Sequence, residues 1–210
     1  MGLLTSVRAW LSGEQDELAL ELRRRGATRE LWRYAGEHGG DVLGAWLECP
    51  RAPWCLEIAA RCEVARPLIA DAVGDLLALP VAEPGAPKVD PREWAVPPAL
   101  SLKGVSGAAL DEGRAAADEF LRGGDTDVFC VQMESLSFAV VEADTTVRKA
   151  RAEIEVAQSF GRFREMLDAS DRYDAAYAHA HAVLADVVRR RIPGELVVAS
   201  LRGRSGHPYR

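Results

Sequence analysis

Apolar residues recur every three or four positions along most of the chain, and the alternation typical of strands is nearly absent. This pattern predicts helices. Between residues 12 and 79 it is divided into short segments by Gly26 and Pro50, because both residue types favour helix ends. Thr28 and Asp41 stand just before apolar segments, where short polar side chains cap helices. We therefore expect a series of short helices in the N-terminal part.

Prolines are concentrated in the middle of the chain, where six of the eleven lie between Pro80 and Pro98. Proline has a fixed φ angle and no backbone N–H, so this density predicts an extended connector on the surface. It separates an N-terminal from a C-terminal set of helices.

The C-terminal part predicts three or four longer helices. Residues 127–143 are apolar on nearly every side, which is typical of a helix in the middle of a bundle. The last helix is expected from about Asp171 to Pro193. Beyond it, the apolar residues 196–201 are expected to dock as a strand or a turn.

The predicted fold class is all-α: a multi-helix, mostly antiparallel bundle with short N-terminal helices and longer C-terminal helices. Residues 1–79 form the short-helix half, 80–98 the proline-rich connector, 99–193 the C-terminal helical half and 194–210 a tail. We expect the two halves to pack together as one domain, because chains of 210 residues usually do.

Charge and cysteine content narrow the function classes. The formal net charge is -6, which disfavours nucleic acid and anionic lipid as partners. No apolar run reaches the length of a membrane span, so we expect no membrane association. Four cysteines without regular spacing are unlike a secreted disulfide framework, and we expect a cytoplasmic protein.

The usual catalytic motifs are missing from the sequence. It has no glycine-rich phosphate loop followed by Lys-Ser/Thr, no H-E-x-x-H and no G-x-S-x-G. We therefore assign no catalytic residue and no cofactor, and we favour a protein that is not an enzyme.

The stretch "LECPRAPWCLEIAARC", residues 47–62, holds three of the four cysteines. If residues 53–62 are helical, the Cα atoms of Cys55 and Cys62 lie roughly 10 Å apart, too far for a disulfide. We interpret both as members of a core-facing stripe. A metal site would need Cys49 to fold back toward Cys55 and a histidine such as His38 to join them, and this alternative stays open.

Tryptophan and arginine side chains gather in the short N-terminal helices. Trp32, Trp46, Arg51 and Trp54 are candidates for a protein interface, because these two residue types carry much of the binding energy of known interfaces. Tryptophans at helical positions also fill cores, since each buries a large apolar area. Both interpretations stay open for the three tryptophans.

Three segments resemble a group of uncharacterised all-α bacterial proteins that includes immunity-type proteins, which neutralise a toxin. The first is "AWLECPRAPWCLEIAARCEVARPLIADAVGDLLA", with Cys-Pro-Arg-x-x-Trp followed by a helix; the others are "GRAAADEFLRGG" and the alanine-rich "AYAHAHAVLADVVRRRIP". The similarity covers residues 41–79 and 107–193. The chain departs from the pattern at Ala52–Pro53, where an acidic residue before Trp is common, and at residues 129–141, which are less alanine-rich.

The leading hypothesis is a protein-interaction module of the immunity type, whose acidic surface binds a basic partner such as a nuclease toxin. The second hypothesis is an enzyme or a ligand- or metal-binding bundle with a pocket near Cys49 and Trp54. The third is an assembly or scaffold protein.

Overall fold

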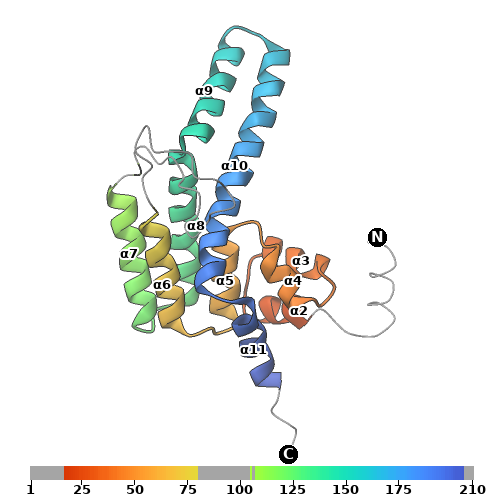
Figure 1. Ribbon diagram of the computed structural model, residues 1–210, viewed down its shortest axis with the longest axis vertical. Coiled ribbons are helices and arrows are strands. Elements are labelled where there is room, and N and C mark those ends of the chain that lie inside the picture. The colour runs from red at the N-terminus through yellow and green to blue at the C-terminus, as the bar shows by residue number, and fades with distance from the viewer. Residues whose placement is uncertain (1–16, 80–104, 106, 206–210) are drawn as a thin grey trace, which may run out of the picture.

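The computed structural model describes residues 17–79, 105 and 107–205, and this part of the chain forms ten α-helices and no strand (Figure 1). The all-α prediction is therefore confirmed. The first five helices are α2 (Glu17–Arg24), α3 (Arg29–Glu37), α4 (Val42–Leu47), α5 (Ala52–Arg61) and α6 (Arg66–Leu77). The predicted connector at 80–98 lies outside the described residues.

The C-terminal helices are longer, as predicted. They are α7 (Gly107–Leu121), α8 (Thr126–Ala143), α9 (Thr145–Ser159), α10 (Phe163–Arg191) and α11 (Gly194–Ser205). None of the described helices combines the length and the apolarity that crossing a membrane would require.

Aspartate side chains begin three of the helices. Asp41 accepts a hydrogen bond from the Gly44 N–H of α4 at 2.9 Å, and Asp125 and Asp144 cap α8 and α9 in the same way. Thr28 precedes α3 at the predicted position but makes no side-chain cap. The Glu57 carboxylate accepts the Thr28 backbone N–H instead, which joins α5 to the start of α3.

Helix α5 lies at the centre of the fold, and nearly all of its residues are buried. It contacts α2, α6, α8 and α10, so the core contains side chains from both halves of the chain. The predicted core-facing position of Cys55 and Cys62 is confirmed, since both are almost completely buried.

The prediction that residues 127–143 lie in the middle of the bundle is wrong. Helix α8 packs its Phe129 and Met133 side against α5 and α7. Its other side faces solvent, with Val128, Val131 and Phe138 exposed by 49%, 67% and 54%. Helix α8 therefore has more large apolar residues than its buried side can accommodate.

The start of the last long helix differs from the predicted one. Helix α10 begins at Phe163 rather than near Asp171, because Gly161 adopts a φ of 64° and ends α9 there. As a result α9 and the first half of α10 form a long hairpin that projects from the bundle (Figure 1).

The predicted strand or turn after Pro193 is a helix, α11, which packs against α4. Its Val197 and Leu201, four residues apart, are buried on one side. Gly194 allows the close approach: a Cβ atom there would lie 2.9 Å from Trp46 Cδ1 and 2.5 Å from Leu43 Cδ1.

Candidate functional site

The structure brings Cys49 and Cys55 together but keeps both away from solvent. Their thiols hydrogen-bond to each other, which lowers the pKa of Cys49, while burial raises the pKa of Cys55. Arg189 of α10 donates to the Cys49 carbonyl oxygen and has Nη1 3.9 Å from Cys55 Sγ. Both cysteines are completely buried, so the pair forms part of the core.

His38 does not join the two cysteines. Its Nδ1 lies 3.0 Å from the Tyr34 carbonyl oxygen and its Nε2 lies 3.3 Å from a Glu48 carboxylate oxygen. Within residues 17–79 and 107–201, no three His, Cys, Asp or Glu side chains are arranged to hold a metal ion.

The four interface candidates occupy three different environments. Trp46 is completely buried beside Gly194, which makes it a core residue with no surface for a partner. Trp32 lies in a groove between α2 and α3, where the Arg23 guanidinium is 5.7 Å from its ring. Arg51 and Trp54 lie together, with 5.3 Å between guanidinium and ring.

Arg51 and Trp54 line a cleft of about 550 Å³ between the start of α5 and the solvent side of α8. We call it the α5–α8 cleft. It is formed by residues of the α2–α3 turn, α3, α5 and α8: Gly26, Thr28, Glu30, Arg51, Pro53, Trp54, Glu57, Arg61, Asp127, Cys130, Val131, Glu134 and Ser135. Cys49 and His38 are not among its lining residues.

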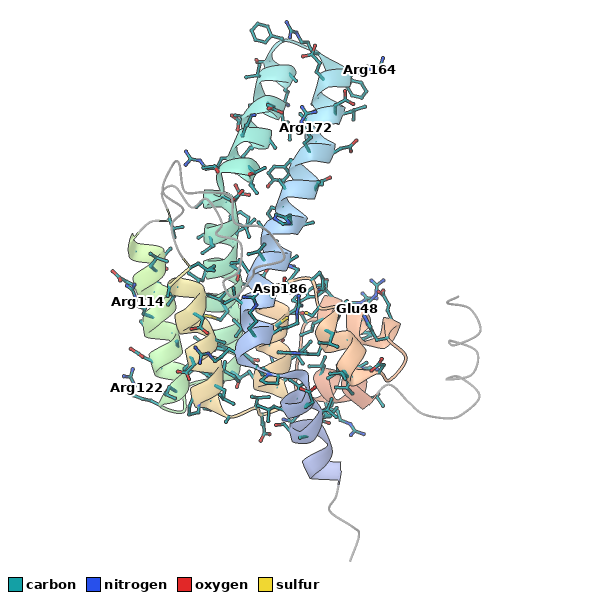
Figure 2. All side chains as sticks on the ribbon, viewed as in Figure 1. Glu48, Arg114, Arg122, Arg164, Arg172 and Asp186 are labelled. Atoms are coloured by element: carbon teal, nitrogen blue, oxygen red, sulfur yellow. The ribbon has the colours of Figure 1, made fainter. Side chains whose placement is uncertain are left out.

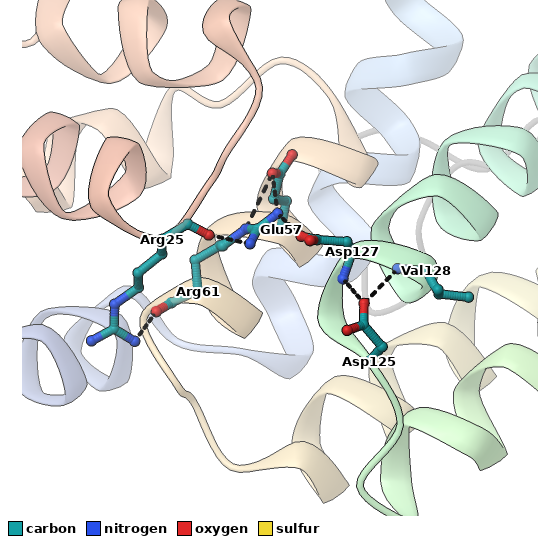
Figure 3. A network of polar contacts seen from close by, with 6 residues as sticks. All are labelled: Arg25, Glu57, Arg61, Asp125, Asp127 and Val128. Atoms are coloured by element: carbon teal, nitrogen blue, oxygen red, sulfur yellow. Dashed lines mark hydrogen bonds and ion pairs between the residues drawn. The ribbon is translucent and has the colours of Figure 1, made fainter.

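A buried ion network lies at one end of the cleft (Figure 3). Arg61 Nη2 lies 3.3 Å from Glu57 Oε1 and 2.6 Å from Asp127 Oδ1, which links α5 to α8. Arg61 also donates to the Arg25 carbonyl oxygen, and Arg25 donates to that of Arg61. Since Glu57 is buried, it depends on Arg61 for its charge compensation, whereas the buried Arg61 is paired with both Glu57 and Asp127.

A second ion pair forms a wall of the cleft. Arg51 donates to Glu134 of α8, while the Arg51 Nε has no hydrogen-bond partner among the described groups. His181 of α10 is 3% exposed, and neither of its ring nitrogens has a partner there either. Burial, together with the Arg51 charge, lowers the pKa of His181 to about 4, so this ring is neutral near pH 7.

Cys130 is the one cysteine that reaches the cleft, and it is partly exposed. Burial raises the pKa of its thiol to about 12, and the nearby Glu57 and Asp127 carboxylates add to the rise. A thiol with this pKa is a poor nucleophile near neutral pH, because the thiolate is the reactive form. Cys130 is therefore not suited to act as a nucleophile in this cleft.

The carboxylates of the cleft outnumber its guanidinium groups by four to two, which gives the lining a net negative charge. Most of these residues were missed by sequence reasoning. The available signal was Glu57 and Arg61, a pair of opposite charges four residues apart inside an otherwise apolar helix.

The exposed row on α8 adjoins the cleft. Val128, Val131 and Phe138 are spaced by three and seven residues, so they share one side of the helix, and Val131 also lines the cleft. We call these three residues the α8 row.

Neither protein-family models, nor curated proteins, nor solved structures give a match to this chain. The resemblance to immunity-type proteins therefore stays a prediction.

Proposed function

We propose that this protein is a protein-interaction module that binds a basic protein through the α5–α8 cleft and the α8 row. The observation that carries the proposal is that the net-negative α5–α8 cleft adjoins the exposed α8 row, since Val131 belongs to both. Interfaces of this kind combine an apolar centre with a charged rim.

The α8 row supports a macromolecular partner. Single exposed apolar side chains are ordinary, but three on one side of a helix concentrate exposed apolar surface there, and such surface marks interaction sites. Trp54 and Arg51 border the same area, and both residue types are frequent among residues that dominate binding energy.

The charge supports a basic partner. The cleft lining and the whole chain are both net-negative, so the long-range electrostatic field and the local contacts both favour a positively charged partner. Such complementarity accelerates association, which suits an immunity-type protein that must capture a basic toxin quickly. A nuclease toxin is the partner class that we favour.

The test places a photo-crosslinking amino acid at Val131 and, as a control, at Leu121, an exposed apolar residue of α7. We expect cross-links from position 131 only, to a protein of high isoelectric point. With that protein purified, Val131→Asp should weaken binding by about tenfold or more, and Leu121→Asp should leave it unchanged. Equal cross-linking from both positions, or an acidic partner, would contradict the proposal.

A growth assay separates an immunity protein from other binders. Expression of the captured partner alone should arrest growth, and co-expression with the wild-type protein should restore it. The Val131→Asp variant should restore growth poorly. A partner that is harmless by itself would refute the immunity role while leaving the interaction role intact.

The ligand-binding alternative is favoured by one observation, the cleft volume of about 550 Å³, which lies within the usual range for small-molecule sites. Native mass spectrometry of the purified protein tests it. A retained small molecule that is lost in the Trp54→Ala variant would favour this alternative.

A further inference from the structure

The hairpin of α9 and the first half of α10 stands apart from the bundle, with Arg164 near its tip and Arg172 farther along it (Figure 2). We call residues 145–179 the arm. The two helices contact each other, and among the residues buried on them are the small Ala150, Ala157 and Ala169. A seam of alanines buries little apolar area, so the arm gains little stability from its own packing.

Several large apolar side chains at or near the tip of the arm face solvent. Phe160 and Phe163 at the tip are exposed by 70% and 68%, and Val156 and Leu167 beside them are also exposed. Together these four residues expose roughly 400 Å² of apolar surface, which is near the size of the largest patch on a typical monomer.

A groove runs along the arm between α9 and α10, with a volume of about 530 Å³. Ala152, Ala157 and Ala169 line it, which leaves room for a large side chain. Its rims carry both signs of charge, for example Glu153 and Arg172, which pair at 2.8 Å. The arm thus contains both an exposed apolar tip and a groove with small residues.

The charge of the arm differs from that of the rest of the chain. Residues 145–179 include six basic and six acidic side chains, whereas the whole chain has a net charge of -6. A basic partner would be attracted to the remainder of the protein and not to this segment. Two copies of a surface with charges of both signs can instead place opposite charges against each other without net repulsion.

We infer that the arm is a dimerisation element: two copies of this chain pair through antiparallel arms, and the tip of each lies in the groove of the other. Seven helical residues, or about 10 Å, separate Phe160 from Glu153 on the groove rim, so a short overlap brings the tip to the groove. Because each copy contributes the same tip and groove, the contact closes as a two-fold dimer.

The test is the mass of the purified full chain, measured by light scattering during size exclusion at roughly 1 to 100 μM. We expect the wild-type protein to reach twice the mass of one chain. Phe163→Asp at the tip and Ala152→Arg in the groove should each raise the dimer dissociation constant by about tenfold or more. Val128→Asp in the α8 row is the matched control and should leave the dimer intact.

A single-chain mass at every concentration would overturn the inference, as would a dimer that both arm variants leave unchanged. Circular dichroism checks that each variant keeps its helices. If Phe163→Asp loses helicity, the result for Ala152→Arg tests the inference, because Ala152 is exposed and lies outside the alanine seam. Dimerisation does not depend on the proposed function. The arm variants test the dimer, and Val131→Asp tests the basic partner.

Discussion

The buried His181 ring makes the stability of this protein sensitive to mild acid. The ring is 3% exposed, its two nitrogens lack partners within the described chain, and the Arg51 guanidinium lies in its neighbourhood. Protonation would place an unpaired positive charge inside the fold. The unfolded chain takes up this proton readily, whereas the folded chain resists it.

The size of the effect follows from the two pKa values. His181 has a pKa of about 4 in the folded state, compared with 6.5 for an ordinary histidine. Well above pH 6.5 the histidine is neutral in both states and does not make stability depend on pH. As the pH falls from 6.5 toward 4, the unfolded state binds more protons, so the free energy of unfolding decreases by about 2 kcal/mol between pH 7.5 and pH 5.

Urea denaturation at pH 7.5 and pH 5 measures this loss. Carboxylates also titrate in this interval, so the informative quantity is the difference between the wild type and His181→Phe, whose ring cannot ionise. Between pH 7.5 and pH 5, the free energy of unfolding of this variant should decrease by about 2 kcal/mol less than that of the wild type. His179→Gln is the matched control, because His179 is exposed two residues away on the same helix. Equal losses in wild type and His181→Phe would refute the reasoning.

Three further predictions concern the cleft and the core. Arg61→Met should lower the free energy of unfolding, measured by urea denaturation, by about 3 to 5 kcal/mol, because Glu57 would remain buried without its counter-charge. Adding Glu57→Gln to this variant should restore part of the lost stability. Gly194→Ala should destabilise by about 1 to 3 kcal/mol through its clash with α4, whereas Gly74→Ala, with open space around it, should be neutral or stabilising. In native protein, N-ethylmaleimide should modify Cys130 before any other cysteine, and slowly, as mass spectrometry of peptides would show.

The features that depend on neighbouring residues in the chain could be predicted. The Asp41 cap forms because its carboxylate needs only the N–H three residues ahead, and Pro53 sits within the first turn of α5, where proline is tolerated. The helical spacing of Cys55 and Cys62 likewise determines that both face the same side. These local rules account for the correct fold class.

The cleft could not be predicted because it is assembled from segments that are distant in sequence. Arg61 and Asp127 are 66 residues apart and meet only after α8 has packed on α5. The position of α8 was misjudged for a related reason: its apolar sides look alike in sequence, and only the packing of α5 and α7 decides which one is buried. Sequence reasoning also missed α11, which packs against α4, a segment about 150 residues earlier in the chain.

The two proposed interfaces should differ in their sensitivity to salt, which follows from their charges and positions. Helix α9 has fifteen residues and is about 22 Å long, whereas the screening length at physiological salt is about 8 Å. Paired arms can therefore hold two negative bundles far enough apart that their repulsion is largely screened. The arms themselves are neutral, so raising the salt should leave the dimer dissociation constant nearly unchanged. The cleft binds through opposite charges, and its affinity for a basic partner should fall as salt rises. Calorimetric titration of that partner and light scattering of the protein alone, both across a salt series, measure the two responses. A dimer that dissociates with salt as strongly as the partner does would contradict the assignment of a neutral interface to the arm.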